Sequence, residues 1–390
     1  MKKILLFLII IPIVTLNAQT VTIPDANFLN ALVNVNVADL DGNGSYESVV
    51  DTNGDGFIQV TEAEAVIGLR TTGRSISSLE GIASFINLEV LEVWSNNLTE
   101  LDLSSNTLLT YIDCSINDLT TVNVTQCPNL TYLGVDGNEI NQLDVTNNTN
   151  LIELVCQGNN FTSIDLSQNT ALEILYCFNS QLETLDVSNN LSIKWIYCHY
   201  NQIEVLDISQ NLLLERLYCQ GNLITSLDLS ANPELFVLSC LDNQLTYLNI
   251  NNGNNMGIQN LNTTSNPNLL CIQVDDVSYA NSLTCDNPFP LWCKDATAEY
   301  SEDCGNLSTE DVSGDAIKLY PNPVEDKLFI ENLTETIEVS SITIYNLQGS
   351  EVLGTTNVAN AITVSNLSPG LYFCSLYTSK GVFTYKILKR

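Results

Sequence analysis

Apolar residues recur at fixed positions through the middle of the chain, with a period of 21 residues. Each unit opens with a leucine or isoleucine, carries a second one three residues later, and places a third apolar residue, usually cysteine, two residues further on. The opening column consists of Leu88, Leu109, Leu130, Leu151, Leu172, Ile193, Leu214 and Leu235. A unit of this length cannot bury its own apolar face and has to cover the face of its neighbour. The period therefore predicts a stack of similar turns.

Polar positions keep the same period. One column is made of asparagine, with Ser180 in the place of one missing member. The asparagines are Asn96, Asn117, Asn138, Asn159, Asn201, Asn222 and Asn243. An amide side chain both donates and accepts hydrogen bonds, so this column can satisfy loop amides that would otherwise be buried without partners.

The complete unit reads approximately L-x-x-L-x-C-x-x-N-x-L-x-x-L-D-L-S-x-N, as in residues 214–232. This pattern resembles the leucine-rich repeat in its short bacterial form, over about half of the chain. The resemblance implies an α/β-type leucine-rich repeat solenoid. Its parallel β-strands line the concave face, its convex side is mostly irregular, and its asparagines bond the backbone of neighbouring turns.

A second polar column is acidic. It holds Asp102, Asp144, Asp165, Asp186, Asp207 and Asp228, with Asn123 and Asn249 on two further turns. Like charges about 5 Å apart repel each other, so these carboxylates must gain a compensating interaction. We expect each one to accept hydrogen bonds from backbone N–H groups of its own turn. A cation-binding ribbon is the alternative.

The cysteines form two main groups. Those in the repeats lie in the third apolar column, at Cys114, Cys156, Cys177, Cys198, Cys219 and Cys240. Cβ atoms on stacked parallel strands stay about 5 Å apart, whereas a relaxed disulfide prefers about 3.8 Å. We therefore expect free thiols that pack as small apolar groups, with metal binding as the alternative. The second group, Cys271, Cys285, Cys293 and Cys304, follows the last repeat and predicts two disulfides.

In repeat proteins of this group, the segment that resembles the stretch around Cys271 closes the solenoid. Cys271 with Cys304 is the preferred pair on this resemblance, which leaves Cys285 with Cys293. The other pairings stay open on the sequence alone.

Function in such an arc belongs to the residues that flank the inward leucines, because strand side chains alternate between faces. In the middle turns these positions are aromatic and basic. The candidate ligand-binding residues are Tyr176, Phe178, Lys194, Trp195, Tyr197, His199, Tyr200, Arg216 and Tyr218. Aromatic and arginine side chains give much contact area for little loss of entropy, which favours a binding surface. The alternative is a tyrosine ladder that only stabilises the sheet.

A candidate metal site lies before the repeats. Residues 51–62 fit the twelve-residue EF-hand loop, in which oxygen ligands come from both ends of one tight turn around Gly56. The expected ligands are Asp51, Asn53, Asp55, Phe57, Gln59 and Glu62, and the expected cofactor is calcium. Upstream, residues 39–44 begin a similar loop, but its twelfth position is Val50. That loop is either a degenerate site or one that shares Asp51.

Both the start of the chain and its charge bear on localisation. Residues 1–18 place Lys2 and Lys3 before an apolar run, which is typical of a secretory signal peptide and too short for a membrane span. No later stretch is continuously apolar enough to cross a bilayer. The formal net charge is −32, and an acidic surface repels nucleic acid and anionic lipid. We expect a soluble, exported protein that attracts divalent cations.

From residue 317 the pattern changes to short alternating runs separated by turn residues, which predicts an antiparallel β-sandwich. The runs are 327–331, 341–345, 361–364, 371–377 and 382–388. The stretches 319–324, 342–349 and 367–372, followed by Lys386, Lys389 and Arg390, resemble the C-terminal sorting domain of the type IX secretion system. The resemblance implies a bacterium of the Bacteroidetes type, contact with the secretion machinery through residues 317–390, and removal of the domain with surface attachment or release. A terminal sandwich module that stays attached is the alternative.

The chain thus divides into six expected segments. They are a signal peptide (1–18), an N-terminal helical cap with the calcium loop (19–68), the leucine-rich repeat solenoid (69–253), a C-terminal repeat cap with disulfides (254–304), a linker (305–316) and the sorting domain (317–390). Within the N-terminal cap, residues 23–33 read as a short helix with a proline near its start.

The combination favours a secreted or surface-attached protein that binds an extracellular protein or glycan and is not an enzyme. The chain has a single histidine, His199, and its carboxylates follow the repeat rather than pairing in a cleft. The alternatives are a structural surface or matrix component and, less favoured, an accessory module of an extracellular enzyme system.

Overall fold

The structure is a computed structural model that describes residues 19–285, 291–304, 317–321, 323–332, 339–346, 350–356, 361–378 and 381–390. The expected signal peptide (1–18) and linker (305–316) lie outside the described residues. The chain divides into two compact units, Met1–Cys304 and Gly305–Arg390. Each unit is described by itself.

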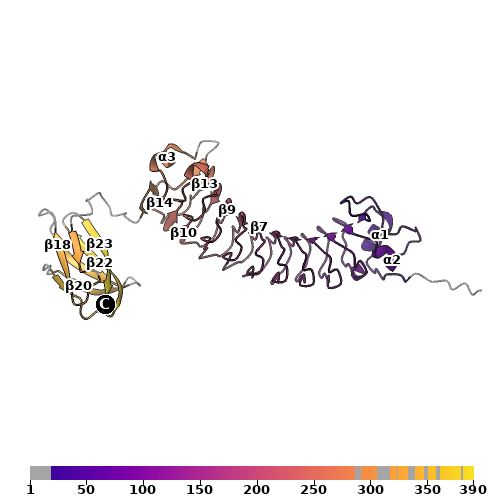
Figure 1. The fold of residues 1–390 in the computed structure, drawn as a ribbon, viewed down its shortest axis with the longest axis horizontal. Helices are drawn as coiled ribbons and strands as arrows, with labels where there is room; N and C mark the ends of the chain where they lie inside the picture. The colour runs from indigo at the N-terminus through magenta and orange to yellow at the C-terminus, as the bar shows by residue number, and fades with distance from the viewer. Residues whose placement is uncertain are drawn as a thin grey trace, which may run out of the picture. The chain divides into compact units, whose positions relative to one another are not determined.

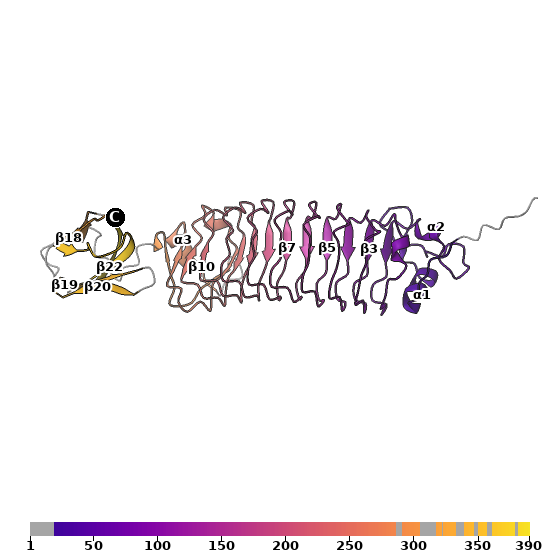
Figure 2. The ribbon, with the colours of Figure 1, turned by 90° about the horizontal axis from the view of Figure 1, so that it is seen from below.

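The first unit is a solenoid built on one long sheet of 12 strands. Its first pair, β1 with β2, is antiparallel, and all later neighbours are parallel. Figure 2 shows β3, β5 and β7 in order along this row, with one strand between each of them and the next. In sheet order the strands are β1 (Ala38–Asp39), β2 (Gly68–Arg70), β3 (Val90–Glu92), β4 (Tyr111–Asp113), β5 (Tyr132–Gly134), β6 (Glu153–Val155), β7 (Ile174–Tyr176), β8 (Trp195–Tyr197), β9 (Arg216–Tyr218), β11 (Val237–Ser239), β13 (Asn260–Asn262) and β15 (Leu291–Cys293).

The repeat explains this sheet. Each residue lies beside the residue one period later, as Tyr176 lies beside Tyr197 and Tyr197 beside Tyr218. The middle residue of the repeat strands, such as Leu175 or Ile196, is fully buried, while its two neighbours are half-buried. One continuous apolar core runs through the unit and includes the cysteine column. The predicted stack of parallel-stranded turns is confirmed.

The opposite side of the solenoid is irregular through most turns, as expected, but it gains a sheet of 4 strands toward the C-terminal end. The strands are β10 (Ser226–Asp228), β12 (Tyr247–Asn249), β14 (Cys271–Gln273) and β16 (Glu299–Ser301). Here Asp228 pairs with Asn249, whose Nδ2 donates to the Asp228 carboxylate over 3.1 Å. The isolated bridge on this side joins Asp102 to Asn123. Within the described residues no two aspartates of the acidic column pair, because facing like charges destabilise a strand pair.

Both ends of the solenoid carry helices, of which α1, α2 and α3 are marked in Figure 1. Helix α1 spans Ala26–Asn34, slightly later than expected, because the Asp25 carboxylate accepts the backbone N–H groups of Asn27 and Phe28 and so caps it. Helix α2 (Val60–Ala63) begins within the last three positions of the predicted calcium loop, and α3 (Val277–Ser282) lies in the C-terminal cap. Two 3₁₀ turns complete the unit, η1 (Ile82–Ser84) and η2 (Asn255–Gly257). No helix among the described residues is long and apolar enough to span a membrane.

The second unit consists of two antiparallel sheets that share one small core. One sheet has the order β17 (Ile317–Tyr320), β18 (Lys327–Asn332) and β21 (Ala361–Thr363). The other has the order β20 (Glu351–Thr355), β19 (Val339–Tyr345), β22 (Gly370–Thr378) and β23 (Gly381–Lys389). Five of these strands coincide with the alternating runs of the sequence. Strands β17 and β20 were not expected, because both lie outside the five alternating runs of the sequence.

Candidate functional site

The first asparagine column holds neighbouring turns together as expected. Asn138 accepts the backbone N–H of Leu119 over 3.0 Å and donates to the carbonyls of Cys114 and Val135 over 3.2 and 2.9 Å. Ser180 breaks this pattern, because its hydroxyl oxygen is buried with no hydrogen-bond partner in the described part of the chain. The scaffold beneath the middle turns is therefore continuous except at Ser180.

A second asparagine column, to which the sequence analysis assigned no role, lies one half-turn away. Its members are Asn106, Asn148, Asn169, Asn190, Asn211 and Asn232, all fully buried. Asn169 donates to the carbonyls of Val145 and Asn148 over 2.9 Å each. Cys127 takes one place in this column and directs its thiol at the Asn106 carbonyl, 3.7 Å away. The repeat unit itself ends on this asparagine, so its period was the signal that could have revealed the role.

The repeat cysteines are fully buried free thiols. Burial raises the pKa of the Cys198 and Cys240 thiols to about 12, so both are neutral at physiological pH. Within the described residues, no group of three or more His, Cys, Asp and Glu side chains is placed to hold a metal ion. These thiols therefore act as apolar filling of the core.

The expected aromatic patch comes together on β7, β8 and β9. The rings of Tyr176, Tyr197 and Tyr218 form one stack, with centroids 4.6 and 4.7 Å apart and planes 15° and 8° from parallel. The ring of Phe178 stacks on that of His199 in the next column, with centroids 4.2 Å apart. This stacking follows from the register of the parallel strands. Residues at the same position of successive repeats lie side by side about 5 Å apart, so aromatic rings at that position stack.

Trp195 and Arg216 form a second element of the patch. The guanidinium carbon of Arg216 lies 4.8 Å from the Trp195 ring centroid and 5.7 Å from that of Phe236. Trp195 Nε1 donates to Glu215 over 3.1 Å. Arg216 Nε is buried without a hydrogen-bond partner in the described residues. A buried donor without a partner costs free energy, so the packing of Arg216 on Trp195 and Phe236 has to offset that cost.

The remaining candidates differ in their availability. Lys194 is paired with Glu173, with 2.7 Å between Nζ and the carboxylate, so its charge is locally balanced. Burial lowers the pKa of His199, which is therefore neutral at physiological pH. Its Nδ1 has no hydrogen-bond partner among the described residues, and its ring meets the edge of Tyr200 with centroids 5.3 Å apart. Tyr200 is the most open member of the patch, at 56 % exposure.

A second aromatic cluster lies nearer the N-terminal end of the same sheet. Tyr111 and Tyr132 stack with centroids 4.2 Å apart. Arg70 lies over the ring of Tyr46 at 4.1 Å and forms an ion pair of 2.7 Å with Glu92. The tyrosine pair could have been found from the period, but Tyr46 comes from the non-repeating cap and carries no such signal.

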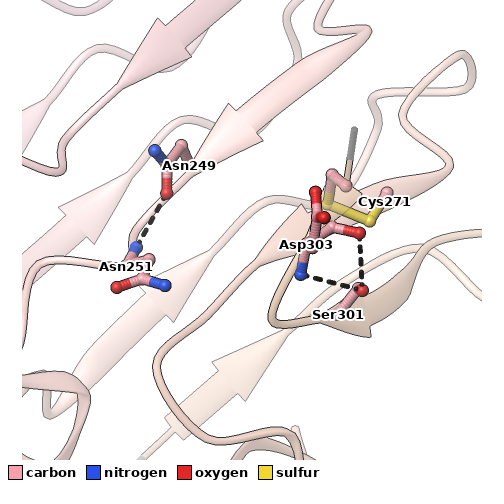
Figure 3. Close-up of a disulfide and its surroundings, with 6 residues drawn as sticks. Asn249, Asn251, Cys271, Ser301 and Asp303 are labelled. Atoms are coloured by element: carbon pink, nitrogen blue, oxygen red, sulfur yellow. Dashed lines mark hydrogen bonds between the residues drawn. A yellow bond between two sulfur atoms is a disulfide. The ribbon is translucent and has the colours of Figure 1, made fainter. Parts of the chain in front are cut away.

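The acidic column acts through hydrogen bonds within each turn. Asp102 and Asp165 each accept the backbone N–H two residues later over 2.9 Å, from Ser104 and Ser167. Asn249 makes the same contact with Asn251, drawn in Figure 3. The same bond recurs at Asn123, Asp144, Asp186, Asp207 and Asp228. This agrees with the first of the two interpretations of the column.

The predicted calcium loop is tightly wound by its own side chains. The Asp51 carboxylate accepts the backbone N–H groups of Gly54 and Gly56 over 2.7 and 2.8 Å. Glu62, from α2, turns back onto the start of the loop and accepts the N–H groups of Thr52 and Asn53 over 2.9 and 3.2 Å. The two ends of the loop are thus brought together, as an EF-hand-like loop requires.

Inside this loop the Gln59 amide nitrogen donates to both carboxylate oxygens of Asp55 over 3.2 and 3.0 Å, and approaches the Phe57 carbonyl at 3.5 Å. Three expected ligand oxygens therefore converge on one hydrogen-bond donor, the Gln59 amide NH₂ group. The residues line an open pocket of about 620 Å³. The upstream loop makes the same turn, since Asp39 accepts the N–H groups of Gly42 and Gly44 over 2.8 and 2.7 Å.

The structure contains the disulfides Cys271–Cys304 and Cys285–Cys293, with Cα atoms 5.8 and 4.8 Å apart. Figure 3 shows the first of these beside Ser301 and Asp303. The bond links the start of β14 to the chain that follows β16, so it ties together two neighbouring strands of the cap. This is the pairing that the leucine-rich repeat resemblance favours.

The columns and the sheet define a leucine-rich repeat solenoid, and the second unit adds a sorting module. Residues 318–390 match the family model described as the secretion system C-terminal sorting domain. No curated protein matches the chain significantly. The chain therefore combines a solenoid of the leucine-rich repeat fold with a C-terminal segment that matches a secretion system sorting domain.

Solved structures agree on the fold. An internalin, InlF, from Listeria monocytogenes is 17 % identical with a TM-score of 0.52, covering 76 % of this chain and all of that chain (100 %). The leucine-rich repeat ectodomain of a plant receptor kinase from Arabidopsis thaliana is 21 % identical with a TM-score of 0.51, covering 61 % of this chain and 31 % of that one. The functional domain of InlJ from Listeria monocytogenes, described as including a cysteine ladder, is 22 % identical with a TM-score of 0.47, covering 94 % and 97 %.

Proposed function

We propose that this protein is exported to the outer surface or released from it, and binds an extracellular protein or glycan through the aromatic patch on its concave face. The observation that carries the proposal is the Trp195–Arg216 pair, in which the guanidinium lies over the indole ring. Arginine and tryptophan are the residues that most often dominate binding energy. Around them lie three stacked tyrosines and the open ring of Tyr200.

The patch supports binding better than catalysis. His199 is neutral at physiological pH, and within the described residues it accepts or donates no hydrogen bond through Nδ1. A general base needs a partner that orients it, and His199 Nδ1 has none among the described residues. The proposal is accordingly for a binding protein without an enzymatic step.

Two substitutions test the patch. The full chain is screened on arrays of host proteins and glycans, and affinity for each hit is measured by calorimetry with the wild type, Trp195→Ala and Tyr197→Ala. We expect each variant to lose about tenfold or more in affinity, since central aromatic contacts dominate interfaces. Tyr247→Ala, on the opposite sheet, is the matched control and should keep full affinity. Silence on both arrays, or unchanged affinity, would favour a structural surface component instead.

We also propose that the loop at residues 51–62 binds calcium. The oxygens of Asp51, Asn53, Asp55, Glu62 and Gln59 would hold the ion together with the Phe57 carbonyl. The donor set suits a hard cation, since it consists of carboxylate, amide and carbonyl oxygens. The convergence of the Asp55 and Phe57 oxygens on the Gln59 nitrogen supports this, because a cation in that place would meet the same oxygens. In calcium-rich surroundings the ion would act as a structural clip.

Calorimetry with calcium chloride tests the loop. Asp51→Ala and Glu62→Ala should abolish the heat of binding, because they remove a carboxylate from each end of the loop. Asp41→Ala is the matched control, since it lies in the upstream loop, where the twelfth position is the buried Val50. If Asp51→Ala leaves the heat unaltered, the proposal fails. A partial loss with Asp41→Ala would assign a second ion to residues 39–50.

A further inference from the structure

One position in each turn adopts a left-handed backbone conformation, directly after the concave column that contains His199. Its φ angles lie between 51° and 66° at Ser95, Ile116, Gly137, Gly158, Asn179, Tyr200, Gly221, Asp242 and Ser265. From Ser95 to Asp242 the N–H at this position donates to a carbonyl of the next turn, as Ile116 does to Asp136 over 2.7 Å and Tyr200 to Gln220 over 2.8 Å, while Ser265 donates to the Asp295 carboxylate. The hydrogen-bond ladder therefore accompanies this conformation from turn to turn.

Most residues in this column suit the conformation. Glycine adopts it without cost, and asparagine and aspartate tolerate it. Ile116 and Tyr200 do not, because a β-branched or bulky side chain in this region is a genuine outlier. Both side chains are 56 % exposed, so burial in the core does not compensate for the strain. Strain that persists at exposed positions concentrates at binding and active sites.

The next turn makes room for the Tyr200 ring. Tyr200 is followed in the column by Gly221, where an added Cβ would lie 2.5 Å from Tyr200 Cδ1. The Tyr200 ring thus occupies the space of the missing side chain, and its T-shaped contact with His199 fixes it from its own turn. Ile116 is followed by Gly137, where an added Cβ would lie at an ordinary van der Waals distance of 3.5 Å from Ile116 Cγ1. Ile116 is held instead by the backbone hydrogen bond from its N–H to Asp136.

The distance between Ile116 and Tyr200, and the charges between them, indicate the length and the charge of the partner's contact surface. Ile116 and Tyr200 are four turns apart, which corresponds to about 19 Å at the usual strand spacing. The concave columns between them carry carboxylates at Asp113, Asp136 and Glu153. Of the two nearby cations, Lys194 is paired with Glu173, and Arg216 packs over the ring of Trp195. An extended ligand that contacts both anchors therefore meets an acidic surface and needs positive charge.

The stacking of the tyrosine rings favours a protein over a glycan as the ligand. A sugar ring packs its C–H groups against an open aromatic face, which carries the negative part of the ring quadrupole. In the Tyr176–Tyr197–Tyr218 stack the rings lie parallel with centroids 4.6 and 4.7 Å apart, so they cover one another's faces. What remains for a ligand is a row of ring edges and hydroxyl groups. Such a row suits the hydrogen-bonding groups and side chains of a protein.

We propose that Ile116 and Tyr200 are the anchor residues through which the concave face holds a protein partner with a basic contact surface. The inference rests on the proposed binding function and deepens it, since it names the class of partner and two contacts that lie about 19 Å apart along the solenoid.

The test uses a phage-displayed library of random peptides, selected on the full chain. The selected peptides are then titrated against the wild type and against an Ile116→Gly, Tyr200→Gly double variant. We expect peptides enriched in lysine and arginine, with about tenfold or greater loss of affinity for the double variant and weaker binding as sodium chloride is added. The melting temperature of the double variant should be equal or higher, because glycine relieves the left-handed strain.

Asn179→Gly is the matched control, since it makes the same backbone change in the same column and removes no apolar side chain; its affinity should not change. Equal binding to the double variant, peptides without basic enrichment, or a marked fall in melting temperature would overturn the inference. Peptides that depend on Trp195 but not on the anchors would leave the binding function standing and refute the anchors alone. No enrichment, or dependence on neither set, would refute both.

Discussion

The amide of Asn159 shows what a single residue contributes to this fold. It accepts the backbone N–H of Ile140 over 3.0 Å and donates to the carbonyls of Val135 and Cys156 over 2.9 and 3.0 Å. All of these groups are buried, so the amide replaces the water that the loops would otherwise need. Ser180 is too short for this role, and its hydroxyl is one of the buried atoms without a partner in the described chain.

At this scale we predict that Asn159→Ala destabilises the protein by about 2 to 3 kcal/mol, because it leaves several buried backbone groups without hydrogen-bond partners. Asn147→Ala is the matched control. Asn147 is exposed and donates one hydrogen bond, to the Thr125 carbonyl, so its loss should cost less than about 0.5 kcal/mol. Denaturant unfolding measures both, and equal losses would contradict the role of the column.

The acidic column predicts that the stability of the fold depends on pH. Hydrogen bonds from the side chain and the backbone N–H of the serine or threonine two residues later lower the pKa of Asp144, Asp165 and Asp186 below 3.8. Because the folded-state pKa lies below the unfolded-state value, these carboxylates stabilise the fold above the unfolded-state pKa. Their contribution is lost as the pH falls through the folded-state pKa.

The melting temperature should therefore fall as the pH is lowered from neutral to below 3.8. A triple variant with Asn at Asp144, Asp165 and Asp186 keeps an oxygen acceptor at each turn but does not titrate, so its curve should be flatter. A triple variant as acid-sensitive as the wild type would show that other carboxylates control acid unfolding. Asp113 acts in the opposite direction, since burial raises its pKa.

Among the elements, the second sheet shows how a small change in a column alters secondary structure. Its strands form where the acidic column changes to Asn249 and then Gln273. Without facing carboxylates the backbones can approach and pair, and Asn249 adds a hydrogen bond to Asp228. The Cys271–Cys304 disulfide then fastens the last two strands of this sheet, β14 and β16, to each other.

We predict that Cys271→Ser with Cys304→Ser destabilises the C-terminal cap more than Cys285→Ser with Cys293→Ser. The first bridge closes a loop with a sequence separation of 33 residues and the second one of 8. Loop entropy alone gives about 4 and about 2 to 3 kcal/mol. Limited proteolysis followed by mass spectrometry compares how readily the segment beyond residue 254 is cut. Greater susceptibility of the Cys285 and Cys293 variant would contradict this order.

At the scale of the whole molecule, the two units have separate apolar cores. The match of residues 318–390 to a sorting domain assigns export to the second unit. The residues of the proposed binding site all belong to the first. On this proposal, export and partner binding draw on different parts of the chain.

We predict that deletion of residues 317–390 leaves the solenoid folded but stops delivery to the outer surface. Expressed in a bacterium with a type IX secretion system, the truncated chain should accumulate in the periplasm, and its circular dichroism should match that of the solenoid in the full chain. Immunodetection on intact cells and in the medium measures delivery. Surface exposure or release of the truncated chain at the level of the full chain would refute the assignment.

The period of 21 residues was sufficient to predict the stacked turns, the parallel register and the meeting of Tyr176, Tyr197 and Tyr218. It suffices because each turn contacts only its neighbours, so one local pattern determines every contact along the row. The alternation of apolar and polar residues likewise predicted five of the seven strands in the described part of the second unit.

Tertiary structure alone decided the contacts that do not repeat. It brought Tyr46 of the cap onto Arg70 and turned the Gln59 nitrogen onto the Asp55 carboxylate. These depend on side-chain rotamers and on packing between segments without a shared period. A linear pattern records which residues face the same way, but not which atoms of neighbouring side chains meet.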